Sequence, residues 1–252
     1  MCATCGCSDD GSVRVIDLRS GGPHDHTHQH GHDHPTTLTL EQRVLAKNDD
    51  LAERNRGWLE ARGVAAVNLM SSPGSGKTTI LARTVRELGA EVALHVVEGD
   101  QETTLDAQRI EATGCPVVQV NTGAGCHLDA SMFAEALHAL DPNGGIVLIE
   151  NVGNLVCPAL FDLGESARVV IMSVTEGTDK PRKYPHMFRT ATIVLLNKID
   201  LLPHVDFDVE AFRRDVALVN PRAQVQHVSA TRGDGLDAWY AWLRAARRRP
   251  AT

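Results

Sequence analysis

Short apolar segments alternate with helical patterns over most of the chain. Seven segments are rich in apolar and β-branched residues, as buried strands are, and span 65–70, 91–97, 116–121, 145–150, 167–174, 191–197 and 224–229. Four others have apolar residues at helical spacing and span 78–89, 128–140, 209–219 and 236–248. Strands that alternate with helices pair in parallel. The pattern therefore predicts an α/β fold with a mainly parallel, doubly wound sheet and helices on both faces.

An amphipathic helix is expected ahead of this sheet. Thr39 and Gln42 form a capping box, and Gly63 can end the helix. Apolar side chains recur between them at helical spacing: Leu40, Val44, Leu45, Leu51, Ala52, Trp58 and Leu59. Packing in the core or at an interface explains this stripe most simply.

Composition narrows the class of protein. The chain has 252 residues, 42% of them hydrophobic, which favours one domain with appendages. A net charge of −7 argues against a general nucleic-acid binder. No apolar run is long enough to span a bilayer, and the start does not resemble a secretory signal. We therefore expect a cytoplasmic protein with reduced thiols and with neither membrane nor nucleic acid as partner.

The segment SSPGSGKTT follows the first predicted strand and precedes a helix, as a phosphate-binding loop does. Lys77 is expected to reach the β- and γ-phosphates, and Thr78 to bind Mg²⁺. Ser71 stands where the general motif has its first glycine, so the match is partial. The expected nucleotide-binding residues of this loop are Gly74, Ser75, Gly76, Lys77, Thr78 and Thr79.

The sequence NKID stands at the end of the sixth predicted strand, where Asn197 is the last residue, and indicates recognition of guanine. The carboxylate of Asp200 can accept hydrogen bonds from guanine N1–H and the exocyclic amine, and adenine offers no such pair. Asn197 is expected to support the base and its loop, and the stem of Lys198 to lie along the ring. Ser229 and Ala230 are expected to close over the base.

Carboxylates and a glycine are expected near the phosphates. Glu150 ends a strand and Gly153 follows it, so Gly153 can present its N–H to the γ-phosphate. Asp100 and Glu102 are candidates for positioning metal or water, although a solvated helix start is the alternative. The expected Mg²⁺ ligands are Thr78, Asp100 and Glu150, and the expected catalytic residues are Lys77, Asp100, Glu102 and Glu150. Without an evident catalytic glutamine or arginine finger, unassisted hydrolysis is expected to be slow.

Cys126, His127 and Cys157 follow two of the predicted strands, at the edge of the sheet that carries the phosphate loop. Two thiolates and an imidazole suit Zn²⁺ or Ni²⁺. The alternative is a pair of structural cysteines and an unrelated histidine. Cys115 precedes a proline that leads into a strand, which favours a place in the core.

Residues 1–36 form a Cys- and His-rich segment with little to bury, so we expect a flexible metal-binding tail ahead of a domain at 37–252. Cys2, Cys5 and Cys7 allow a disulfide, a redox pair or a metal site; a reducing compartment disfavours the first. Weak buffering of nickel or zinc is expected from alternate histidines, although an expression tag is the alternative. They are His24, His26, His28, His30, His32 and His34.

Taken together, the motifs resemble the HypB family, the nickel-insertion GTPases of hydrogenase maturation, and more distantly the urease accessory GTPase. The resembling segments are MCATCGC, the His tract, SSPGSGKTT, EGDQETTLDA, NTGAGCHLDA, ENVGNLVCP, SVTEGTDKPRKYP, NKID and SATRGDG. The resemblance implies a P-loop GTPase that uses GTP and Mg²⁺ and forms a homodimer promoted by GTP or metal. It also implies Ni²⁺ delivery to the hydrogenase large subunit with a companion nickel chaperone.

The resemblance further implies a tight nickel site at Cys2, Cys5 and Cys7 and a second site, for Zn²⁺ or Ni²⁺, at Cys126, His127 and Cys157. Lys180 and Lys183 fall in a family segment close to the nucleotide and the neighbouring subunit. Two other functions remain open on the residues alone. One is a nickel store whose nucleotide fold is vestigial or serves only as a dimer switch. The other is a sister chaperone that serves urease or another metalloenzyme.

Overall fold

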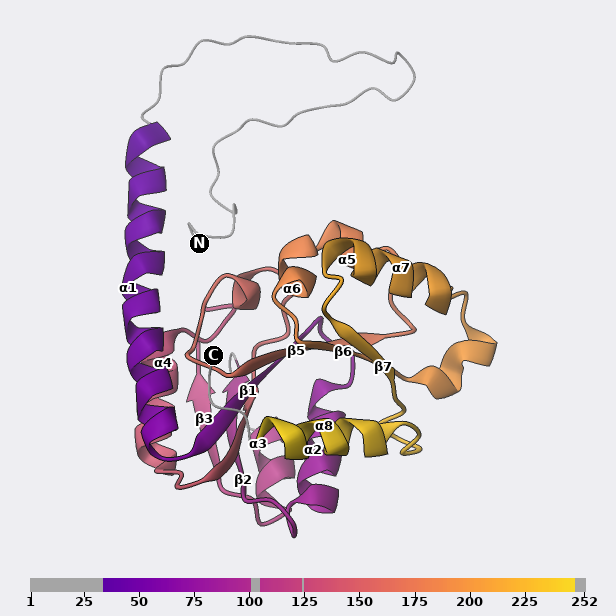
Figure 1. Cartoon of the computed structure of the whole chain (residues 1–252), viewed down its shortest axis with the longest axis horizontal. Coiled ribbons are helices and arrows are strands. Elements are labelled where there is room, and N and C mark those ends of the chain that lie inside the picture. The colour runs from indigo at the N-terminus through magenta and orange to yellow at the C-terminus, as the bar shows by residue number, and fades with distance from the viewer. Residues whose placement is uncertain (1–33, 101–104, 124, 248–252) are drawn as a thin grey trace.

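The computed structural model describes residues 34–100, 105–123 and 125–247. They form one sheet covered by helices on both faces, with the long first helix along one side (Figure 1). The strands are β1 (Val64–Ser71), β2 (Leu94–Asp100), β3 (Val117–Asn121), β4 (Gly145–Glu150), β5 (Ala167–Ser173), β6 (Ile193–Asn197) and β7 (Gln224–His227). The α-helices are α1 (His34–Ala61), α2 (Lys77–Leu88), α3 (Leu105–Glu111), α4 (Ala130–Leu140), α5 (Lys180–Lys183), α6 (Pro185–Arg189), α7 (Val209–Val219) and α8 (Leu236–Ala246). Two 3₁₀ helices complete the order, η2 (Cys157–Ala159) and η3 (Ile199–His204).

The sheet has seven strands in the order β3-β2-β4-β1-β5-β6-β7, and the pairs along it are parallel. The chain builds one half of the sheet first and then crosses β1 to add β5, so β1 lies where the strand order reverses. Ligands bind beyond the carboxyl ends of strands at such a reversal. The topology confirms the predicted doubly wound α/β fold and gives the phosphate loop after β1 this position.

Both faces of the sheet are buried, which explains the continuous apolar runs of its strands. Residues of α2, α8 and α3 pack on one face, in a cluster that includes Ile80, Leu243 and Ile110. The other face carries two clusters, one under α6 and α7 and one under α1 and α4. The predicted covering of both faces is therefore confirmed. Among the described residues, no helix is both long enough and apolar enough to cross a membrane.

Helix α1 begins at His34, ahead of the start that the capping box at Thr39 predicts. Pro35 falls in its first turn, where proline is tolerated because no intrahelical N–H is needed there. The predicted stripe is only partly buried: Ala52 and Leu59 are core residues, whereas Val44 is 44% exposed. Figure 1 shows the first turns of α1 extending past the neighbouring elements.

Some boundaries differ from those expected. β2 continues to Asp100, so this residue ends the strand instead of following it, and a solvated helix start does not describe it. Helices α3, α5 and α6 were not expected, because they are short and two of them contain proline. Residues 101–104 lie outside the described residues, so the structure does not place the predicted Glu102.

Candidate functional site

A cavity of about 530 Å³ opens at the carboxyl edge of the sheet, beside the end of β1. The loop 71–79 forms one wall. The other lining residues come from several elements: Glu98, Gly99, Asp100, Arg109, Glu150, Val152, Gly153 and Lys198. The structure therefore brings the predicted phosphate loop together with the predicted carboxylates Asp100 and Glu150. Gly153 lies against this loop, because a Cβ on Gly153 would come within 3.3 Å of Pro73 Cα.

Glu150 is the centre of the polar contacts in this cavity. Its Oε1 accepts hydrogen bonds from Lys77 Nζ at 2.9 Å and from Thr78 Oγ1 at 2.6 Å. The side chain is buried, with 1% of its surface exposed, and Lys77 supplies the opposite charge that such burial requires. The buried Oε2 of Glu150 has no hydrogen-bond partner among the described residues. It is therefore a buried acceptor with capacity for a further ligand.

A second buried carboxylate, Glu98, was missed by sequence reasoning. It lies opposite Glu150 in the parallel pair of β2 and β4, and only 2% of its surface is exposed. Both glutamates line the cavity with Asp100. The residues before Asp100 are EG, and the sequence does not reveal that β2 neighbours β4. The register of these strands is what places the two glutamates side by side.

The NKID loop is hydrogen-bonded to the phosphate loop. Asn197 Nδ2 donates to Ser75 O at 2.9 Å, and Lys198 Nζ donates to Gly74 O at 2.7 Å. Lys198 has a positive φ of 61°, which turns the chain sharply at the end of β6. These two contacts hold Asn197 and Lys198 of the predicted guanine loop against the phosphate loop.

The segment after β7 reaches the same place. Ser229 Oγ donates to Asp200 Oδ1 at 2.6 Å, and Ala230 N donates to Asn197 Oδ1 at 3.0 Å. Arg83 of α2 holds the segment by donating to Ala230 O at 3.0 Å. The structure therefore brings together all five residues predicted to surround the base.

Side-chain hydrogen bonds surround Ser71, the residue that stands where the general phosphate-loop motif has its first glycine. Ser71 ends β1 with its side chain buried, and its Oγ donates to Ser72 O at 2.8 Å. Ser72 Oγ in turn donates to Glu176, whose other oxygen accepts from Ser173 N at 3.0 Å. Glu176, in the loop after β5, was not singled out in the sequence. Side-chain contacts thus hold the start of the loop where the motif usually has a glycine.

Replacing Gly76 by alanine should weaken nucleotide binding about tenfold to a hundredfold, because small misplacements at a site cost this much. Gly76 has a φ of 97°, and an added Cβ would collide with Asn197 Nδ2. The collision would separate the guanine loop from the phosphate loop. GDP titration by calorimetry measures the loss. The control is Gly144→Ala, because Gly144 also has a positive φ (73°) but an added Cβ meets nothing within 4 Å. Equal GDP affinity in both variants would contradict the role assigned to this contact.

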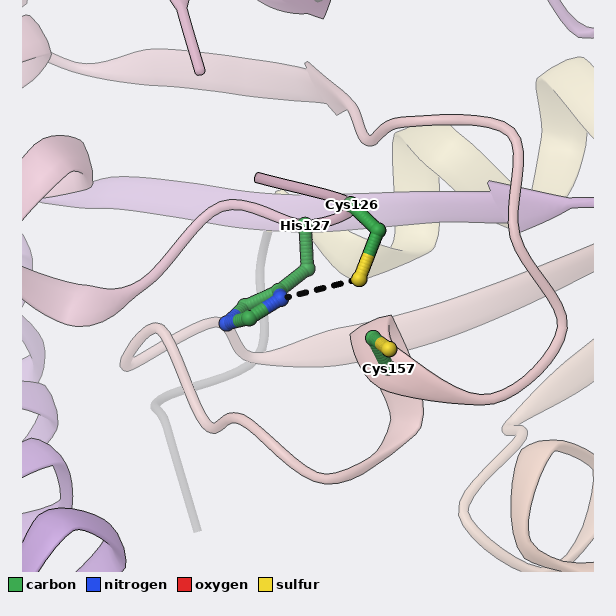
Figure 2. Close-up of side chains that lie close together, drawn as sticks. All are labelled: Cys126, His127 and Cys157. Atoms are coloured by element: carbon green, nitrogen blue, oxygen red, sulfur yellow. Dashed lines mark hydrogen bonds between the residues drawn. The ribbon is translucent and has the colours of Figure 1, made fainter. Parts of the chain in front are cut away.

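Cys126, His127 and Cys157 form a cluster beside the cavity. Their ligand atoms all lie within 4.8 Å of one another, and Cys126 Sγ is 3.7 Å from His127 Nδ1. Figure 2 shows these two atoms facing each other, with the Cys157 side chain beside them. A tetrahedral zinc with ordinary bond lengths needs sulfur and nitrogen about 3.6 Å apart. The arrangement thus fits a metal ion with little rearrangement, which unrelated cysteines would not be expected to do.

The surroundings of His127 favour the protonation state that a metal needs. Burial lowers the pKa of His127 below its usual value, against a smaller opposite effect of Asp129. The imidazole ring stacks on Phe161, with ring centroids 3.9 Å apart. A neutral ring held in one orientation is a better metal ligand than a charged, mobile one.

The cluster and the cavity share the loop that follows β4. Val152 and Gly153 of this loop line the cavity, and Cys157, the first residue of η2 where the loop ends, is a cluster residue. Asn151 begins the loop: its Oδ1 accepts from Val152 N at 3.0 Å and from Leu128 N at 3.2 Å. Leu128 directly follows His127. The buried side-chain amide of Asn151 therefore joins the loop that lines the cavity and leads to Cys157 to the segment that carries Cys126 and His127.

The turn before Cys126 makes a second connection. Thr122 N donates to Asp100 O at 2.9 Å, and Gly125 N donates to Thr122 O at 2.8 Å. The segment that carries Cys126 is therefore hydrogen-bonded to the end of β2, beside the cavity. The cavity with the phosphate loop and the Cys126, His127 and Cys157 cluster thus lie at the same edge of the sheet, as the sequence predicts. Cys2, Cys5, Cys7 and the histidines from His24 to His32 lie outside the described residues, and of His34 only the backbone is described.

Comparison with known proteins shows which family this sequence and fold resemble. Residues 65–227 match the family of CobW/HypB/UreG nucleotide-binding domains. The hydrogenase maturation factor HypB of Azotobacter vinelandii is 57% identical over 211 residues, which cover 83% of this chain and 70% of that protein. The HypB protein of Escherichia coli K12 is 56% identical over the same length, with 83% and 73% covered.

Two crystal structures match over most of their length. The structure of HypB from Helicobacter pylori in complex with nickel has a TM-score of 0.78 and 36% identity, and covers 82% of this chain and 97% of that one. HypB from Archaeoglobus fulgidus has a TM-score of 0.76 and 42% identity, with 81% and 100% covered. From its nucleotide-binding domain, its fold and its sequence identity to these proteins, the chain belongs to the HypB family of hydrogenase maturation factors.

Proposed function

We propose that this chain is a GTP-hydrolysing metallochaperone that couples GTP binding and hydrolysis to nickel delivery in [NiFe]-hydrogenase maturation. The observation that carries the proposal is the loop after β4, which lines the phosphate cavity at Gly153 and supplies Cys157 to the metal cluster. A change at the γ-phosphate has a direct path to a metal ligand. The similarity to hydrogenase maturation factors and to the Helicobacter pylori protein in complex with nickel supports the choice of client and cargo.

In the nucleotide half, Lys77 leaves Glu150 to neutralise the β- and γ-phosphates, while Asp200 and Asn197 hold the guanine. Thr78, Asp100 and Glu150 are the residues that would hold Mg²⁺, and the unpartnered Oε2 of Glu150 fits this role. Bound Mg²⁺ neutralises charge on the phosphate oxygens. Thr78 Oγ1 donates its proton to Glu150, and its hydroxyl oxygen is a ligand of the kind that Mg²⁺ prefers. Asp100 is the candidate for orienting the attacking water, with Glu98 beside it, and turnover is slow.

In the cargo half, the thiolates of Cys126 and Cys157 and the imidazole of His127 hold Ni²⁺ or Zn²⁺. Three protein ligands leave a position for water, for a donor in transfer, or for a partner subunit. The proposal assigns capture to Cys2, Cys5 and Cys7, with weak buffering by the His tract. A site with three protein ligands can pass its ion to another protein, whereas a closed site with four protein ligands would resist this transfer.

The proposal extends to a cytoplasmic homodimer promoted by GTP or metal, and to a companion nickel chaperone and the hydrogenase large subunit as partners. The three-ligand cluster supports this extension, because a ligand from another chain can complete it.

Titration of the full-length chain with Ni²⁺ in each nucleotide state tests the coupling. Cys2, Cys5 and Cys7 are replaced by serine, so that the core cluster dominates binding. With a non-hydrolysable GTP analogue, nickel affinity should differ from that with GDP by about 5- to 150-fold, the usual range of coupling between sites. Identical affinities would reject the coupling and leave a nickel store as the better function.

Asn151→Ala should remove most of this nucleotide dependence, because Asn151 joins the β4 loop to the segment after His127. The nickel affinity with GDP and the nickel affinity with the GTP analogue should each change by less than the ratio between them changes. Thr84→Val is the control: it removes the acceptor of the Trp239 indole N–H on the other face of the sheet, and coupling should persist. If Asn151→Ala keeps the wild-type difference, the path through this amide is excluded.

A further inference from the structure

Two buried asparagines on one side of α1 reach into the body of the protein. Asn48 and Asn55 have 6% and 5% of their surface exposed, and they lie two helical turns apart, on one face. Neighbours on this face, Ala52 and Leu59, are apolar core residues. A buried amide is costly unless its hydrogen bonds are satisfied, so packing alone would favour an apolar side chain at these positions.

The amides connect the two segments that carry the metal ligands. Asn48 Oδ1 accepts from Ala130 N at 2.9 Å, while its Nδ2 donates to Asp162 O at 2.8 Å. Asn55 Nδ2 donates to Ala130 O at 2.8 Å and to Leu163 O at 3.0 Å. Ala130 stands shortly after His127, and Asp162 and Leu163 stand shortly after Cys157. Each asparagine therefore bridges the segment after His127 and the segment after Cys157.

A third residue of α1, Arg56, contacts the segment that carries the aromatic ring against which His127 stacks. Arg56 NH2 donates to Asp162 Oδ2 at 3.0 Å. Asp162 directly follows Phe161, the ring on which His127 stacks. The position of Asp162 is thus set from α1 through both its carbonyl and its carboxylate, and this position sets the ring that supports a metal ligand.

We propose that Asn48 and Asn55 are positioning residues of the metal site, so that α1 holds Cys126, His127 and Cys157 in binding geometry. The inference rests on the metal-binding role of this cluster under the proposed function. It assigns α1 a task besides covering the sheet: the helix that connects the Cys- and His-rich segment to the domain also sets the geometry of the domain's own metal site.

The test uses Co²⁺ as a spectroscopic probe and Zn²⁺ in competition with a chelator. Every sample is full-length chain with Cys2, Cys5 and Cys7 replaced by serine. Asn48→Ala and Asn55→Ala should each weaken binding about 10- to 100-fold, as loss of outer contacts does at metal sites. The thiolate–cobalt absorption should also shift or weaken, and GDP affinity should stay within about twofold, because these residues do not line the phosphate cavity.

Two control variants separate positioning from general stability. Asn220→Ala removes an amide that donates to three carbonyls, those of Phe188, Arg189 and Ala191, in another part of the fold. Leu59→Ala destabilises the packing of α1 without removing a hydrogen bond to the ligand segments. Both should keep the cobalt spectrum and the wild-type metal affinity, even if their melting temperatures fall.

The possible outcomes are distinct. Wild-type cobalt spectra and zinc affinities in both asparagine variants would overturn the inference, while a loss of binding in Cys126→Ala would leave the proposed function intact. If Cys126→Ala also bound as wild type does, both would fail. Should an asparagine variant not fold, Arg56→Met decides. It removes the contact with Asp162 from a side chain that is not fully buried, and it should weaken metal binding several-fold.

Discussion

Asp200→Asn should change the chain from binding guanosine to binding xanthosine triphosphate. The carboxylate of Asp200 is expected to accept two hydrogen bonds from guanine, each worth about 1.5–3 kcal/mol as a bond to a charged group. Their loss should raise the Kd for GTP about 10²- to 10⁴-fold. Xanthine carries a carbonyl where guanine carries its amine, so the asparagine Nδ2 can donate to it.

The surrounding contacts should survive this change. Ser229 Oγ donates to Asp200 Oδ1, and an asparagine oxygen can accept the same bond. Binding and turnover of GTP, XTP and ATP are measured for wild type and variant. Asp206→Asn is the control for loss of charge, because Asp206 is exposed on the connection after η3. A variant that still prefers GTP, or a wild type that turns over ATP as well as GTP, would contradict the assignment of the guanine loop.

Cys157→Ala should weaken metal binding by the domain about a hundredfold. Structural zinc sites with four ligands bind with about 10–16 kcal/mol, so each ligand contributes about 3 kcal/mol. Cys157 is 2% exposed and contributes one of the two sulfurs of the cluster. Its loss should also remove the effect of nucleotide on metal affinity, because this residue links the β4 loop to the ion. Zinc competition in the background without Cys2, Cys5 and Cys7 measures both effects.

The chain offers a matched cysteine. Cys115 lies between α3 and β3, and its Sγ is 3.2 Å from Leu94 O. Burial raises the pKa of Cys115 to about 11, so this thiol stays protonated and is a poor metal ligand. Cys115→Ala should leave metal affinity unchanged. A hundredfold loss in this variant, or none in Cys157→Ala, would show that the cluster does not hold the ion.

The sheet could be predicted because its central strands are buried on both faces and therefore appear as continuous apolar runs, whereas the edge strands β3 and β7 are only partly buried. The phosphate and guanine motifs could be recognised because their chemistry requires particular residues at fixed spacing. Helix α3 was not predicted because its seven residues, LDAQRIE, are too few and too polar to show a helical period. The end of β2 was missed because Glu98, Gly99 and Asp100 do not resemble a buried strand.

Contacts between distant segments explain the rest. Nothing in the sequence shows that Glu98 lies opposite Glu150, because strand order is a property of the whole fold. The role of the two asparagines of α1 was easier to predict from the sequence. Asn48 and Asn55 are seven residues apart and fall on the face of Ala52 and Leu59, and polar residues on a buried face indicate specific hydrogen bonds.

Cys157 is carried by η2, a single helical turn. Its backbone bonds are Ala159 N to Val156 O at 3.2 Å and Leu160 N to Cys157 O at 3.0 Å. Two such bonds contribute about 1–3 kcal/mol together, far less than unfolding a strand would cost. Under the proposed function, an ion bound at the cluster must leave it quickly. We expect that unwinding this turn would let the Cys157 thiolate move away from the ion while the sheet stays folded.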